Sequence, residues 1–285
     1  MWGEDLDDDR VRQPAPAGAR LVRVAVRVAR EGTRPGAFVG HGSLKPFFFG
    51  DSARPLFGLH HPPSGGTPRR WGVVICNPFG QEYIRAHRSL RELAKRLAET
   101  GFHVLRFDYF GCGDSGGDGD EATLDQWLRD ISAAIAEVQE TSSSPKFALV
   151  GLRLGATLSA LLAAQRGDVE RLVLWDPILD GAAYLKELRV AHEGWLRDHA
   201  QGRRGAAEGE PLREALGFSI SPALASCVEQ LRLVPDDWPS AKALVIDHRS
   251  FPGAQVWVHE DGVNRILVPH AVLESITSWL GSACS

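Results

Sequence analysis

The chain has 285 residues, of which 44% are apolar and 24% charged, so it is long enough to build one large globular domain around a buried core. Its formal net charge of −4 argues against a general affinity for nucleic acid or for an anionic membrane. No apolar run approaches the roughly 18 residues of a membrane span, and the acidic start Glu4–Asp9 is unlike a signal sequence. The cysteines have no paired or metal-type spacing, so we expect a cytoplasmic protein with free thiols. We also expect neither a metal nor a cofactor.

Residues 1–44 differ in composition from the rest of the chain. They are rich in Arg, Gly, Pro and Ala, and their one pattern is the alternation Leu21–Val28, which is compatible with an edge strand. Because Pro and Gly surround that alternation, we predict a flexible N-terminal extension over 1–44 and a folded domain over 45–285.

From residue 45 onward, short apolar runs predict a series of strands. Pro46–Asp51 and Arg54–His60 are separated by three residues and predict an antiparallel pair. Runs typical of strands buried on both faces follow at Trp71–Asn77, His103–Asp108, Lys146–Val150 and Arg171–Asp176. Two further strands are predicted at Ala241–Asp247 and Ala254–Val258.

Helices are predicted between these strands from apolar residues at helical spacing. The first begins near His87 and carries Leu90, Leu93, Ala94 and Leu97 on one face. The second opens at Thr123, which with Gln126 forms a capping-box pattern. Others are predicted at Gly155–Gln165 and Pro269–Leu280.

The alternation of strand and helix predicts right-handed crossovers, and therefore a mainly parallel central sheet with helices on both faces. Residues 182–240 interrupt the alternation with two helical pieces, Ala182–His199 and Pro222–Leu233. An insertion at this point would lie over the carboxyl ends of the strands, where open α/β sheets bind ligands. We therefore predict a small helical cap.

The segment Gly151-Leu-Arg-Leu-Gly155 connects a predicted strand to a predicted helix, which is the context of a nucleophile elbow. Its small residues allow the strand and helix backbones to pass closely. Arg153 stands at the centre, where an elbow presents its nucleophile. We predict two oxyanion donors, the N–H of Leu154 and the N–H of Phe79. Phe79 and Gly80 follow the preceding central strand.

Four segments resemble bacterial α/β-hydrolases of the serine-aminopeptidase-like and exosortase-system-associated type: Gln81–Arg88, Phe107–Gly116, Gly151–Ala156 and Trp175–Gly181. The resemblance extends from about Pro46 to Leu280. It implies the α/β-hydrolase fold, and some members of the group share an arginine at the elbow. Hydrolase or peptidase chemistry follows from it only by analogy of fold.

The sequence departs from a Ser-His-Asp triad in two places. Arginine stays protonated and only donates hydrogen bonds, so Arg153 cannot be a nucleophile or a base. In relatives, the histidine lies between the last strand and the last helix; here the aligned residue is Asn264 or Arg265, and the nearest substitute is His259. The candidate acids are Asp176 and Asp247, which follow two neighbouring predicted strands.

Two interpretations of Arg153 remain open, and each implies a function. In the first interpretation, Arg153 is an anion anchor beside a helix N-terminus, and Glu82 lies near the pocket. The chain would then have a capped site for a small acyl or carboxylate-bearing substrate. Hydrolase or acyl-transfer chemistry would then need water activated by a general base. If Arg153 is instead paired internally with Asp176, Glu82 or Asp247, the chain is a non-catalytic binding or scaffolding protein. Cys112 and Ser115 are the other nucleophile candidates.

Overall fold

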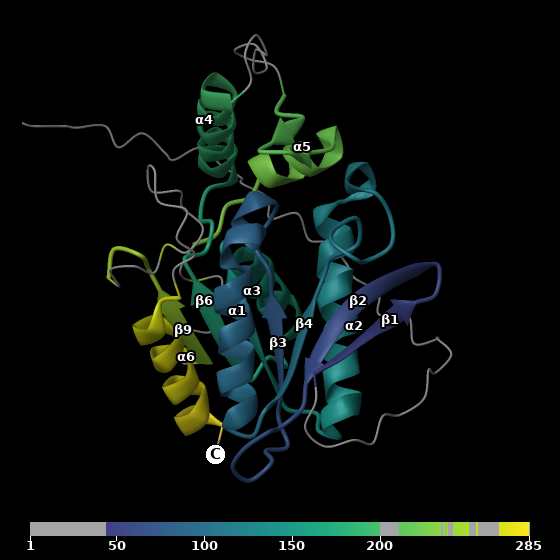
Figure 1. Cartoon of the computed structure of the whole chain (residues 1–285), viewed down its shortest axis with the longest axis vertical. Helices are drawn as coiled ribbons and strands as arrows, with labels where there is room; N and C mark the ends of the chain where they lie inside the picture. Colours follow the sequence, from purple (N-terminus) through teal and green to yellow (C-terminus); the bar gives the residue numbers. More distant parts are fainter. Residues whose placement is uncertain are drawn as a thin grey trace, which may run out of the picture. The chain divides into compact units, whose positions relative to one another are not determined.

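The computed structural model describes residues 44–199, 211–234, 236, 238, 242–250, 255 and 268–284 (Figure 1). The predicted extension lies outside these residues apart from its last position, and the predicted strand Ala254–Val258 lies outside them apart from Gln255. The candidate base His259 also lies outside the described residues.

In this described part, a central sheet has seven strands in the order β1-β2-β4-β3-β5-β6-β9. Their bounds are β1 Lys45–Asp51, β2 Arg54–His61, β3 Gly72–Cys76, β4 His103–Phe107, β5 Phe147–Leu152, β6 Arg171–Trp175 and β9 Ala243–Ile246. β1 and β2 form the predicted antiparallel pair, and β2 is also antiparallel to β4. All other neighbours are parallel, so the prediction of a mainly parallel sheet is confirmed.

Helices cover both faces of this sheet, as Figure 1 shows. α1 (Gln81–Glu99) and α6 (His270–Ala283) cover one face, and α2 (Leu124–Ser142) and α3 (Leu154–Arg166) cover the other. Every residue of β3 and β5 is buried, because both strands have a helical layer on each side. Apolar side chains therefore form one buried cluster beneath α1 and α6 and a second beneath α2 and α3.

One helix start and one helix cap differ from their predictions. α1 begins at Gln81 and not near His87, because Gly80 at φ 58° turns the chain, and the buried residue of the first helical turn is the acidic Glu82 and not an apolar residue. At α2, the Thr123 hydroxyl accepts from the Gln126 N–H (3.2 Å), as predicted. The prediction that the Gln126 side chain completes the capping box is wrong, because its amide donates to the Asp130 carboxylate (2.7 Å).

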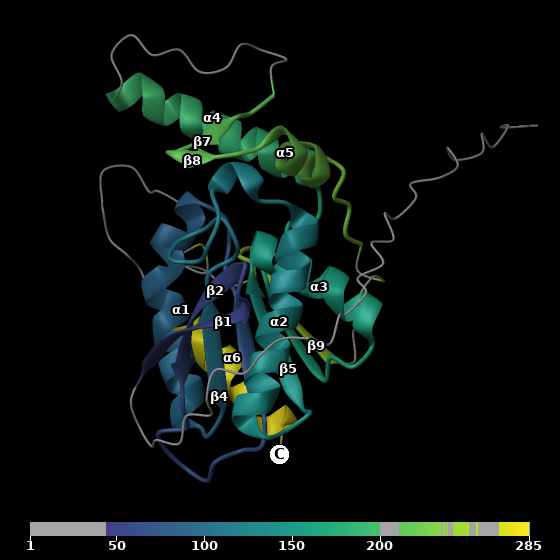
Figure 2. The same cartoon turned by 90° about the vertical axis from the view of Figure 1, so that its right-hand side faces the viewer.

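The segment between β6 and β9 leaves the central sheet. It contains α4 (Gly181–His199), a short hairpin of β7 (Glu214–Ala215) and β8 (Phe218–Ser219), and α5 (Pro222–Glu229). Figure 2 shows this α4–α5 insertion beyond the end of the sheet at which α1 and α3 begin. The hairpin was not predicted, and α5 is shorter than predicted. A turn of 3-10 helix, Gly119–Glu121, packs next to β8. None of the described helices combines the length and the apolar character that crossing a membrane requires.

Candidate functional site

Arg153 lies at a sharp turn between β5 and α3. Its backbone angles are φ 52° and ψ −120°, a region that residues other than glycine rarely adopt. A Cβ atom at Gly151 would collide with the backbone of Ala156, and one at Gly155 would collide with the carbonyl of Asn77. The two glycines therefore permit the close passage of strand and helix that holds Arg153 at the carboxyl edge of the sheet.

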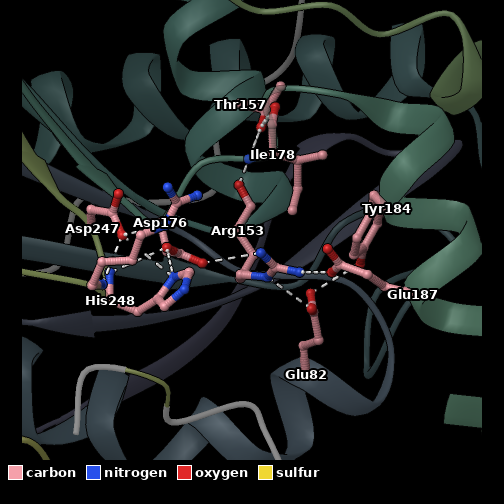
Figure 3. Close-up of polar contacts among 10 residues, drawn as sticks. Glu82, Arg153, Thr157, Asp176, Ile178, Tyr184, Glu187, Asp247 and His248 are labelled. Atoms are coloured by element: carbon pink, nitrogen blue, oxygen red, sulfur yellow. Dashed lines mark hydrogen bonds and ion pairs between the residues drawn. The ribbon is translucent and has the colours of Figure 1, made fainter. Parts of the chain in front are cut away.

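The Arg153 guanidinium donates to three carboxylates from three different parts of the fold (Figure 3). Nε donates to Glu82 on α1 (2.9 Å), Nη1 to Asp176 after β6 (3.0 Å) and Nη2 to Glu187 on α4 (2.7 Å). The side chains of Arg153, Glu82 and Asp176 are only 10%, 9% and 8% exposed, whereas that of Glu187 is 63% exposed. Arg153 thus has two buried anionic partners and one that faces solvent.

Tyr184 joins α4 to the same ion network. Its ring centre lies 5.4 Å from Arg153 Cζ, within the range of a cation–π contact, and its hydroxyl donates to Glu82 Oε2 (2.9 Å). Burial raises the pKa of Glu82, although the charge and hydrogen bond of Arg153 act in the opposite direction. Burial, the largest single cause, lowers the pKa of Arg153, but the charges of the neighbouring acidic groups and the hydrogen bond to Glu82 together outweigh it and raise that pKa. The guanidinium therefore stays cationic.

Asp176 links the arginine to a histidine that the sequence did not single out. It lies at the end of β6 with a positive φ of 47°, a second strained position beside Arg153. While Oδ2 accepts from Arg153, Oδ1 lies 2.5 Å from His248 Nδ1 and accepts from the His248 N–H (3.3 Å). Asp247 Oδ1 lies 3.6 Å from the same Nδ1. Asp247 therefore faces His248, while Glu82 and Asp176 bond to the guanidinium.

Asp176, Asp247 and His248 have ligand-type atoms within 4.8 Å of one another, a spacing that a metal ion can bridge. In this structure each of them already has a partner within the protein. Asp176 uses one oxygen for Arg153 and the other for His248, so the cluster is explained by its own hydrogen bonds.

The predicted oxyanion donors lie at the same edge of the sheet. Phe79 and Gly80 follow β3, and Leu154, the first residue of α3, follows β5, the neighbour of β3. The ring of Phe79 packs against those of Trp127 (5.8 Å between centroids) and Phe218 of the insertion (6.4 Å). The loop after β3 thus contacts both α2 and the insertion through the ring of Phe79.

Neither of the other nucleophile candidates is activated. The Ser115 hydroxyl donates to the Asp108 carbonyl and accepts from the Phe57 N–H (2.8 Å), so it braces the end of β4. Burial raises the pKa of the Cys112 thiol to about 12, which keeps it protonated near neutral pH.

The structure therefore brings together Arg153, Glu82 and Asp176 among the residues chosen from the sequence. Three further participants were missed: His248, Tyr184 and Glu187. His248 could have been found, because it directly follows Asp247 at a strand end. Tyr184 and Glu187 are three residues apart and share a helix face, but no motif marks them.

In the described residues, the central sheet is mostly parallel, six helices are distributed over the domain, and a strand–turn–helix lies at its centre. These features define an α/β-hydrolase fold. Residues 67–211, about half of the chain, match the family "Serine aminopeptidase, S33", and the chain belongs to this family. No curated protein matches the chain.

Solved structures of other proteins share this fold. Est1E from Butyrivibrio proteoclasticus with bound ferulic acid is 18% identical, with a TM-score of 0.55 over 83% of this chain and 96% of its own. A soluble variant of monoglyceride lipase from Saccharomyces cerevisiae, in complex with a substrate analogue, is 12% identical, with a TM-score of 0.55 over 88% and 100%. An esterase from Pyrococcus furiosus is 14% identical, with a TM-score of 0.52 over 90% and 100%. At these identities the likeness shows the fold alone.

Proposed function

We propose that this chain is a non-catalytic member of its family, which binds a small acyl or carboxylate-bearing molecule beneath the α4–α5 insertion. The observation that carries this proposal is the Arg153 guanidinium, held by three carboxylates at the centre of the strand–turn–helix. We infer that this turn corresponds to the nucleophile elbow and that the insertion acts as a cap.

The chemistry of arginine supports this proposal. Its guanidinium has no lone pair available for attack and stays protonated, so it supplies neither a nucleophile nor a base. The buried carboxylates of Glu82 and Asp176 compensate its charge, and leaving one member of such a network without its partner is costly. The network therefore stabilises the turn, whereas a serine there would leave these carboxylates without their cation.

The surroundings of the turn support an acyl ligand. The rings of Phe79 and Phe218 are partly buried and lie beside the residues that we expect to donate to a carbonyl or carboxylate oxygen. Small-molecule sites typically combine such an apolar wall with a few convergent polar groups.

A second candidate function is hydrolysis by activated water, and the Asp176–His248 pair favours it. A histidine whose Nδ1 is held by a carboxylate offers Nε2 as a proton acceptor, which is the arrangement of a general base. His248, and not His259, would then be the base. Its side chain is 32% exposed, so water reaches it.

Turnover of a panel of aryl esters and aminoacyl anilides separates these functions. We expect no turnover by the wild-type protein above that of a heat-denatured control. Turnover that appears only in Arg153→Ser would support a non-catalytic wild type. Turnover by the wild type that is lost in His248→Gln would refute our proposal and support water activation.

A further inference from the structure

Glu187 differs from the other two partners of Arg153 in its exposure and its origin. Glu82 and Asp176 come from elements attached to the central sheet and are buried, whereas Glu187 comes from α4 and its side chain is mostly exposed. Glu187 is therefore the one of these three carboxylates that can leave the guanidinium for solvent without breaking the core.

The energetic difference follows from this exposure. An ion pair with a solvent-exposed partner contributes little to stability, because water and salt compete for both charges. The two inner carboxylates are shielded from that competition, so their attraction to Arg153 is stronger. Nη2 is thus the guanidinium donor whose carboxylate partner can be exchanged.

We propose that the Glu187 carboxylate occupies the position of a ligand carboxylate at Arg153 Nη2, and that a small carboxylic acid binds by displacing it. This inference rests on the proposed binding function and deepens it, because it names the group that is recognised and the side chain that competes with it.

The exchange leaves the charge around the guanidinium unchanged. One carboxylate replaces another at Nη2, so Glu82 and Asp176 repel the incoming anion no more than they repel Glu187. The exchange also leaves α4 in place, because Tyr184 still donates to Glu82 and its ring still lies against Arg153. Glu187 therefore acts as an internal competitor, and the insertion need not detach.

The direct test is calorimetric titration of the wild type, Glu187→Gln and Glu193→Gln with sodium octanoate at fixed ionic strength. Glu193→Gln is the matched control, because it removes the same charge from the same helix at a position six residues beyond Glu187, the residue that accepts from Arg153 Nη2. We expect octanoate to bind Glu187→Gln about two- to fivefold more tightly than the wild type, in line with a weak exposed ion pair. Glu193→Gln should bind as the wild type does.

Octanamide, which has the same chain without the charge, should show no preference for Glu187→Gln. Equal octanoate affinity in Glu187→Gln and Glu193→Gln, or no octanoate binding by any of the three proteins, would overturn the inference. So would a crystal structure of Glu187→Gln with octanoate in which the carboxylate lies away from Arg153 Nη2. Equal but measurable octanoate binding in the two variants would leave the proposed binding function standing, whereas the absence of binding would count against both, so the two failures are distinguishable.

Discussion

At the scale of single residues, the guanidinium of Arg153 donates to two kinds of carboxylate. Glu82 and Asp176 are buried with it, and Glu187 is exposed. The first two contacts stabilise the turn, while the third is available for exchange. The same side chain can therefore serve both structure and ligand recognition.

This division predicts unequal costs of substitution. Arg153→Ser leaves two buried carboxylates without their cation and should lower the free energy of unfolding by about 3–5 kcal/mol. Glu187→Gln should lower it by less than about 1 kcal/mol, because that ion pair is exposed. Urea denaturation measures both values. Adding Glu82→Gln to Arg153→Ser should recover part of the loss, and a smaller loss for Arg153→Ser than for Glu187→Gln would contradict this account.

The sequence placed Arg153, Glu82 and Asp176 near one another because each adjoins the carboxyl end of a predicted central strand. Such ends meet at one edge of a parallel sheet, so local pattern is enough to predict their proximity. Tyr184 and Glu187 come from an insertion whose position relative to the sheet is set by tertiary packing. No local pattern encodes that position, so their contacts with Arg153 could not be predicted.

At the scale of elements, the crossing of β5 and α3 depends on the absence of side chains at two positions. A Cβ at Gly155 would meet backbone carbonyls, which cannot move aside as the end of a flexible side chain can. By contrast, a Cβ at Gly281 in α6 would meet nothing within 4 Å.

Gly155→Ala should therefore destabilise the protein severely or prevent its folding, as judged by expression in soluble form and by thermal unfolding. Gly281→Ala is the matched control and should be neutral or stabilising by up to about 1 kcal/mol, because alanine favours a helix. A Gly155→Ala protein that unfolds at the wild-type temperature would show that strand and helix do not pass as closely as described.

The start of α2 offers a prediction about capping. Thr123→Ala removes the hydroxyl that accepts from the Gln126 N–H and should cost about 1 kcal/mol of stability in chemical denaturation. Thr123→Ser keeps the oxygen and should cost clearly less. Equal losses in the two variants would mean that the methyl group, and not the cap, accounts for the effect.

Elements with strong local signals were predicted well, and their ends less so. β3 and β5 are continuous apolar runs, and their complete burial follows from that composition. The early start of α1 was missed because the residue that its first turn buries is Glu82, which pairs with Arg153, and not an apolar residue. The β7–β8 hairpin is too short for a periodic pattern.

At the scale of the whole molecule, buried histidines make stability depend on pH. Burial is the main cause that lowers the pKa of His60 and of His61 on β2 to about 4, from 6.5 in an unfolded chain. Between pH 6.5 and 4 the unfolded chain binds protons that the folded chain does not. The contribution of each histidine to stability is therefore greatest above pH 6.5 and falls as the pH drops through this window, by up to about 3 kcal/mol.

Urea midpoints at several pH values between 7.5 and 4.5, at constant ionic strength, measure this dependence. His61→Gln should flatten the decline, because one of the two groups no longer titrates while glutamine can still accept the hydrogen bond that Arg106 donates to His61. A decline of unchanged steepness in His61→Gln would assign the acid sensitivity to other groups.

The central claim is that Arg153 replaces the nucleophile, so that no activated serine remains at the turn. Reaction of the purified wild-type protein with a fluorophosphonate probe, followed by mass spectrometry of its peptides, tests this claim most directly. We predict no labelling above that of the heat-denatured protein, while an active serine esterase treated in parallel is labelled. Stoichiometric labelling of one serine in the native protein, lost on denaturation, would contradict the claim.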